Sequence, residues 1–94
     1  MEKNNLKIEI NKETAEGKYA NIVLTAHSHS EFIIDFAKIL PGLKEANVHS
    51  RIIMTPSHAK RFMKSLENTI KQYENEHGEI KISDKDRPNI GFKK

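Results

Sequence analysis

The stretch "HSHS", His27–Ser30, carries two histidines whose spacing could serve a metal ion. In extended backbone His27 and His29 point to the same side, so both imidazoles could reach one ion. His49 and His58 are further histidines, but no third histidine and no carboxylate stands at a recognised ligand spacing. A surface turn with two histidines is far commoner, so we expect neither a metal nor another cofactor.

Asp35, His49 and the serines supply the residue types of a catalytic acid, base and nucleophile. The sequence has no G-x-S-x-G motif, and its 4 glycines form no phosphate-binding loop. It also has no cysteine, which removes thiol nucleophiles, thiolate metal sites and disulfides. We therefore expect no catalytic residues and a non-enzymatic protein.

Asp35 and Arg51 form the most specific pair of charged residues, because they fall on two strands predicted to be neighbours. One interpretation is a cross-strand ion pair that fixes the register of the strands. The other is a charged spot inside a protein interface. The two interpretations are compatible, and both need the strands that position the pair.

Alternating apolar and polar residues predict about four strands, and a longer apolar period predicts one helix. The strands are expected at residues 6–10, 19–26, 31–40 and 47–54. The helix is expected from Pro56 to His77, because Thr55 can cap its start and Gly78 can end it. We expect an α+β fold: an antiparallel meander of about four strands followed by one long amphipathic helix. Residues 1–83 would form a single domain, and residues 84–94 a flexible C-terminal tail.

Matching the apolar faces of neighbouring strands predicts their registers. Ala26 is expected opposite Phe32 in the first hairpin, and Phe32 opposite Met54 in the second. One face of the sheet then carries Phe32, Ile34 and Phe36, and we expect the apolar stripe of the helix to cover it. The stripe consists of Ala59, Phe62, Met63, Leu66, Ile70 and Tyr73.

The same registers place an apolar band around the ion pair on the opposite face of the sheet. One helix covers one face, so this band has no predicted cover within the chain. An exposed apolar surface of this kind usually binds a partner, and a two-fold homodimer is the commonest form. The predicted interface residues are Val23, Ile33, Asp35, Ile39, Arg51 and Ile53.

The composition fits a small cytoplasmic binding protein. The 94 residues carry a formal net charge of +3, which permits nucleic-acid contact as a secondary property but does not indicate it. No apolar run is long enough to span a membrane, and the N-terminus lacks the apolar core of a signal peptide. We expect a partner to dock on the basic face of the helix and on the tail, at Lys60, Arg61, Lys64, Lys71, Ile90 and Phe92.

Five short motifs stand out between Tyr19 and about Ile80: Glu31-Phe32, Asp35-Phe36, Pro41-Gly42, Ser50-Arg51-Ile52 and Pro56-x-His58-Ala59-Lys60. Together they resemble the domain of unknown function 3467 family of small prokaryotic proteins. That family has no established catalytic residues, so the resemblance implies none here. In Bacteroidetes genomes, genes of this family often lie beside those for the large RNA polymerase subunits, which implies an accessory of the transcription machinery. The order of strands and helix is also similar to that of the SecB export chaperone, which is built on a sheet that joins across subunits.

The residues and the resemblance together predict a small protein-binding module that forms a homodimer. Its larger partner would be RNA polymerase or another large bacterial assembly. The alternative is a SecB-like chaperone, which would bind unfolded clients through exposed apolar sheet surface.

Overall fold

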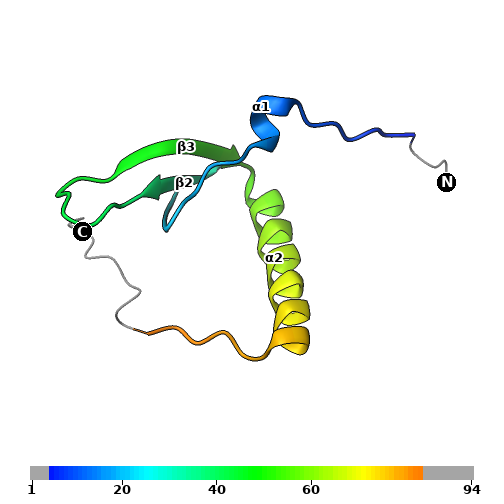
Figure 1. Cartoon of the computed structure of the whole chain (residues 1–94). Helices are drawn as coiled ribbons and strands as arrows, with labels where there is room; N and C mark the ends of the chain where they lie inside the picture. The colour runs from blue at the N-terminus through cyan, green and yellow to red at the C-terminus, as the bar shows by residue number, and fades with distance from the viewer. Residues whose placement is uncertain (1–4, 84–94) are drawn as a thin grey trace.

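The computed structural model describes residues 5–83 of the chain. Its elements follow in the order α1 (Lys12–Ala15), β1 (Ile22–His27), β2 (Phe32–Lys38), β3 (Asn47–Met54) and α2 (Pro56–His77). The described strands form one antiparallel sheet in the order β1-β2-β3, and α2 follows β3 directly (Figure 1). The α+β class, with a meander followed by one long helix, is therefore confirmed.

The N-terminal segment departs from the prediction, because residues 6–10 lie outside the sheet. Their apolar side chains face solvent, and Ile8 is 90% exposed. Alternation alone does not make a strand, since the backbone also needs a neighbouring strand for its hydrogen bonds. The chain instead forms α1, whose start is capped by the Asn11 side chain accepting the Thr14 N–H at 2.8 Å. Within residues 5–83 the sheet thus has three strands rather than about four.

The hairpin of β2 and β3 has the predicted register. Phe32 lies opposite Met54, and Asp35 lies opposite Arg51. Near the far end of the hairpin a β-bulge leaves His49 as an extra residue in β3.

The β1–β2 register differs from the prediction by one residue, because Ala26 lies opposite Ile33 and not Phe32. Such a shift moves every β1 side chain to the other face of the sheet. Asn21 accounts for the observed register. Its side-chain amide donates to the Ile39 carbonyl at 2.9 Å and its carbonyl accepts the Ile39 N–H at 2.8 Å. The Asn21 backbone N–H donates to the Ala37 carbonyl at 3.1 Å, so this asparagine extends the ladder beyond β1.

Helix α2 begins and ends where the sequence predicts. The Thr55 hydroxyl accepts the His58 N–H at 3.3 Å, and Pro56 occupies the first turn. Gly78 ends the helix with a φ of 98°, a conformation that disfavours side chains, and its N–H donates to the Glu74 carbonyl at 2.9 Å.

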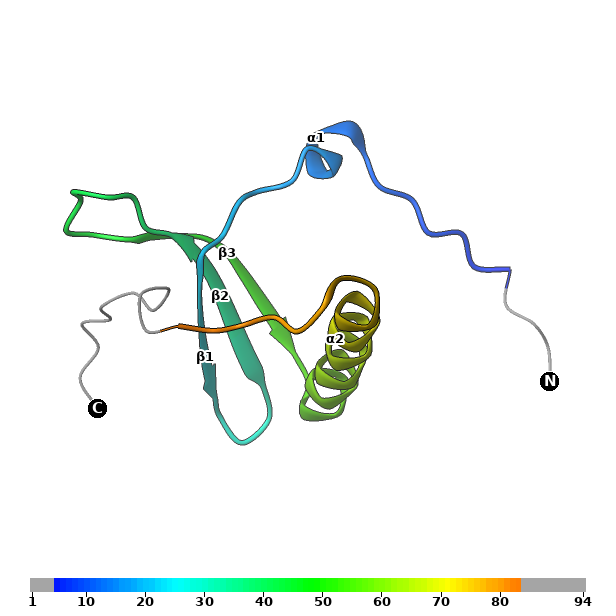
Figure 2. The same ribbon diagram turned by 60° about the horizontal axis from the view of Figure 1, so that its bottom comes forward.

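The expectation that α2 covers the sheet is wrong. The helix leaves the end of β3 and points away from the strands, and the contacts between elements concentrate in the two strand pairs (Figures 1 and 2). Thr55 alone connects β3 to α2, and its extended backbone (φ −71°, ψ 161°) matches the restriction imposed by a following proline. One extended residue provides no loop in which the chain could turn back onto the sheet.

The core of the described chain is correspondingly small. Within residues 5–83, the buried apolar side chains are Ile22, Ile34 and Ala37. All other apolar side chains of this part are half-buried or exposed. Much of the apolar surface of residues 5–83 is therefore not covered by other parts of the same segment.

Asn21→Ala should lower the free energy of unfolding by about 1 kcal/mol, because two hydrogen bonds at the end of the sheet are lost. Urea denaturation of the purified chain would measure the change. The matched control is Asn68→Ala, an exposed position within α2, which should leave stability unchanged or slightly raised. Equal effects of the two substitutions would contradict the role given to Asn21.

Candidate protein interface

The apolar stripe of α2, defined above as Ala59, Phe62, Met63, Leu66, Ile70 and Tyr73, faces solvent. Its five large side chains are between 39% and 54% exposed. A shallow groove on the same helix is lined by Met63, Leu66 and Ile70, with Glu67, Lys71 and Glu74 on its rim. Each half-exposed apolar side chain forgoes roughly 1 kcal/mol of burial free energy. The stripe is therefore an exposed apolar surface that runs along one side of α2.

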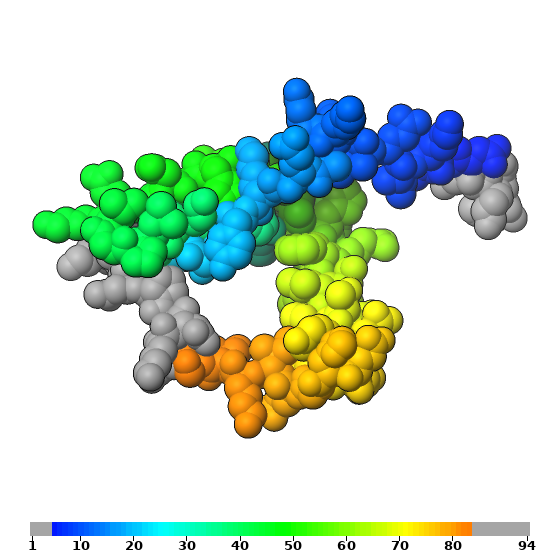
Figure 3. Space-filling view, in the orientation of Figure 1, coloured from blue at the N-terminus to red at the C-terminus, as the bar shows by residue number. Residues whose placement is uncertain are grey.

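Helix α2 stands apart from the strands, with open space beside it (Figure 3). Figure 3 shows an opening bordered by the sheet, by α2 and by residues 78–83. Two views of the ribbon agree that the helix lies on neither face of the sheet (Figures 1 and 2). The α2 stripe is accessible along the length of the helix.

A second apolar surface is the Ile33 face of the sheet, on which Ile33 lies between Ala26 and Ile53. Ile53 is 53% exposed, and Ile33 is half-buried. By strand alternation and register, this face consists of Ile22, Leu24, Ala26, Ile33, Asp35, Ala37, Val48, Arg51 and Ile53. Four of the predicted interface residues, Ile33, Asp35, Arg51 and Ile53, are thus brought together.

Asp35 and Arg51 form a bidentate ion pair at the centre of the Ile33 face. Arg51 Nε donates to Asp35 Oδ1 at 2.8 Å, and Arg51 Nη2 donates to Asp35 Oδ2 at 2.9 Å. The Asp35 side chain is 13% exposed and that of Arg51 59%. The hydrogen bond from Arg51, with a smaller contribution from its charge, lowers the pKa of Asp35 below the ordinary value of 3.8 despite opposing desolvation. The same bond raises the pKa of Arg51.

The other side of the sheet is also apolar, and we name it the Phe36 face. It consists of Val23, Thr25, His27, Phe32, Ile34, Phe36, Ser50, Ile52 and Met54. The imidazole of His27 stacks on the ring of Phe32, with centroids 5.7 Å apart.

The other two predicted interface residues, Val23 and Ile39, lie elsewhere than in the paired part of the Ile33 face. Val23 was placed on the Ile33 face, but it lies opposite Phe36 and belongs to the Phe36 face. The reason is the one-residue shift of β1. Ile39 lies just beyond β2, where its backbone is held by Asn21 and its side chain is half-buried.

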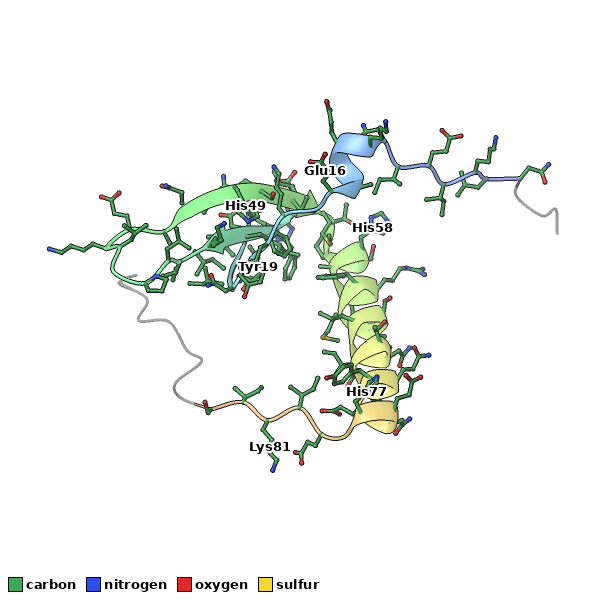
Figure 4. The ribbon with its side chains drawn as sticks, in the orientation of Figure 1. Glu16, Tyr19, His49, His58, His77 and Lys81 are labelled. Atoms are coloured by element: carbon green, nitrogen blue, oxygen red, sulfur yellow. The ribbon has the colours of Figure 1, made fainter. Side chains whose placement is uncertain are left out.

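The histidines come from several elements, and His27, His49 and His77 each have contacts with other residues. His49 Nε2 donates to the Tyr19 carbonyl at 3.0 Å, and in the neutral ring Nδ1 accepts from the Ser50 hydroxyl at 2.9 Å (Figure 4). These bonds connect Tyr19, in the segment that leads into β1, with β3. His58 and His77 lie near opposite ends of α2 (Figure 4). Among residues 5–83, no three His, Cys, Asp or Glu side chains gather as metal ligands would.

The predicted docking residues divide between α2 and the tail. Lys60, Arg61, Lys64 and Lys71 are exposed on α2, and Lys71 borders the apolar groove. Ile90 and Phe92 lie outside the described residues. None of the helices within residues 5–83 is both long and apolar enough to cross a membrane.

The sequence contained a signal for the exposed helix, although the prediction did not use it. A single residue, Thr55, separates the last residue of β3 from the start of α2, and Thr55 precedes a proline. Connections between strands and packed helices usually need more residues. The position of Thr55-Pro56 therefore indicated that the α2 stripe is an external surface and not a cover for its own sheet.

The comparisons with known proteins give one family. The model of the family described as "Protein of unknown function (DUF3467)" matches residues 1–82, which is most of the chain. No curated protein and no solved structure matches the sequence significantly.

Asp35→Asn should destabilise the chain at neutral pH, because it leaves Arg51 without its carboxylate. The folded-state pKa of Asp35 is depressed, so the contribution of the pair is complete above the ordinary value of 3.8 and is lost as pH falls through the folded-state pKa. The difference in unfolding midpoint between wild type and variant should therefore shrink on acidification. Glu31→Gln, which removes an exposed carboxylate outside the ion pair, is the matched control. A difference in unfolding midpoint between wild type and Asp35→Asn that stays constant with pH would contradict the stabilising role of the ion pair.

Proposed function

Because the chain belongs to the family described as "Protein of unknown function (DUF3467)", its function must be argued from its surfaces, and we propose a non-enzymatic, homodimeric protein-binding module of the cytoplasm. The observation that carries the proposal is the exposed apolar stripe of α2. Soluble chains seldom leave a contiguous apolar surface open unless a partner covers it. The two apolar faces of the sheet support the same conclusion.

The larger partner is a bacterial assembly, and RNA polymerase is the first to test. The side of α2 that carries Arg61 and Lys64 is basic, because these residues project away from the apolar groove. A basic helix face suits an acidic protein surface, and it increases the rate of association with such a surface. The apolar stripe and the basic face would then serve different partners, namely a second copy and the assembly.

A SecB-like chaperone is the second candidate, and the apolar character of both sheet faces favours it. Val23 and Ile52 on the Phe36 face and Ile53 on the Ile33 face are about half exposed. An unfolded client could cover such residues without a specific sequence. A chaperone would bind many unfolded proteins, whereas an accessory protein would bind one folded assembly.

Arg61→Glu with Lys64→Glu should abolish docking on the assembly if the basic face mediates it. Purified RNA polymerase from the same cells, titrated with the tagged full-length chain, gives the affinity. We expect the double variant to bind at least about tenfold more weakly, because each lost 1.4 kcal/mol is a factor of ten. Lys18→Glu with Lys44→Glu makes the same charge change on exposed residues outside α2 and should bind as wild type.

A parallel titration with a chemically unfolded test protein separates the two candidates. Binding of polymerase in a fixed ratio, with no binding of the unfolded protein, supports the accessory function. Binding of the unfolded protein but not of polymerase, with no effect of the charge reversals, would contradict the accessory function and support the chaperone function.

A further inference from the structure

Five of the six residues of the α2 stripe, together with His77, repeat with the spacing of a coiled-coil helix, and Phe62 lies beside this line. Ala59, Met63, Leu66, Ile70, Tyr73 and His77 follow one another at alternating steps of four and three residues. Such a 4-3 repeat places its members on one line along the helix and suits pairing with another helix. A stripe that covered a sheet would tend to be wider and less regular.

We propose that the α2 stripe binds the α2 stripe of a second copy of this chain in an antiparallel helix pair. The inference rests on the proposed homodimer and names its interface. If the two helices cross near position 68, the facing side chains are Leu66 with the partner's Ile70, Met63 with the partner's Tyr73, and Ala59 with the partner's His77. Every apolar position of the repeat then has an apolar or aromatic counterpart.

The sizes of the facing side chains are complementary in this arrangement. Ala59, the smallest residue of the repeat, faces the partner's bulky His77 ring. The flexible thioether of Met63 faces the aromatic ring of the partner's Tyr73, a contact that sulfur favours. Tyr73 and His77 already pack against each other within one helix, with ring centroids 4.8 Å apart. Alternation of small and large residues across facing positions is a condition for close packing.

The charges beside the stripe favour the antiparallel direction. The positions that flank it on one side are Lys60, Glu67 and Glu74. In an antiparallel pair these positions face each other across the interface. Lys60 then lies beside the partner's Glu74 at one end of the pair, and Glu74 lies beside the partner's Lys60 at the other end. Glu67 faces its own copy at the centre, which is unfavourable, although Lys64 and Lys71 lie one turn away on either side.

A second copy fits this stripe better than the chain's own sheet does. The one-residue connection at Thr55 directs α2 away from β3, so the stripe cannot reach the strands of its own chain. The large side chains of the stripe are between 39% and 54% exposed and therefore accessible to a second helix. The antiparallel direction also aligns the two helix dipoles favourably.

Site-specific cross-linking tests the arrangement. The sequence contains no cysteine, so an introduced cysteine is the only thiol that can react. With a short bis-maleimide reagent, full-length Glu67→Cys should form a covalent dimer, because position 67 faces its own copy. Lys60→Cys alone should not, since its two copies would be about 21 Å apart along the helix axis. A mixture of Lys60→Cys and Glu74→Cys should give the heterologous dimer. Gln72→Cys, on the outer side of α2, is the control that should stay uncoupled.

Charge substitutions give a second measurement that does not depend on removing apolar residues. Light scattering should find wild type as a dimer, Lys60→Glu as a weaker dimer, and Lys60→Glu with Glu74→Lys restored towards wild-type affinity. Glu67→Gln should strengthen the dimer, because it removes the central repulsion.

Three outcomes would overturn the arrangement. A wild-type chain that stays monomeric would remove the homodimer as well as the helix pair. A dimer in which Lys60→Cys links to itself, or Glu67→Cys does not link, would keep the homodimer and reject this interface. Cross-linking of α2 to RNA polymerase subunits in place of a second copy would assign the stripe to the assembly. Arg61 lies outside the helix pair, but Lys64 lies one turn from Glu67. The dimer content of the Arg61→Glu, Lys64→Glu variant is therefore measured by light scattering in the same samples. Lost polymerase binding by a variant that is still dimeric is assigned to the basic face.

Discussion

The junction Thr55-Pro56 is the constraint on which the rest of the structure depends. Thr55 is at once the residue that leaves β3, the residue that proline holds in an extended conformation and the cap of α2. Because the connection has no further residues, the helix cannot turn back over the sheet. The apolar stripe of α2 and the apolar faces of the sheet, which would cover each other in a compact domain, are therefore presented separately.

This separation explains why so small a chain is apolar on three surfaces. Within residues 5–83 the buried apolar residues are Ile22, Ile34 and Ala37, which is a small core for that many residues. Isolated helices in water are marginal, and most of their stability in proteins comes from the packing of an apolar face. A dimer through α2 would supply that packing, and folding and association would then be coupled.

The sequence predicts those features that local chemistry determines. The bounds of α2 follow from Thr55, Pro56 and Gly78, and the β2–β3 register follows from one apolar match together with the opposite charges of Asp35 and Arg51. The β1–β2 register does not follow, because both faces carry apolar residues and either alignment buries some of them. There the hydrogen bonds of Asn21 to Ile39 decide, and these join residues that are distant in the sequence. The strand at residues 6–10 and the cover of the sheet were predicted wrongly, because a periodic pattern does not say which surface an element meets.

The central claim is that α2 depends on a second chain for its stability, and helix content as a function of concentration tests it most directly. Far-UV circular dichroism of the full-length chain should lose helical signal on dilution, in step with dissociation measured by sedimentation, and Glu67→Gln should move both transitions to lower concentration. A helical signal that persists unchanged after the chain has dissociated to monomers would contradict the claim, because α2 would then be stable with its apolar stripe exposed.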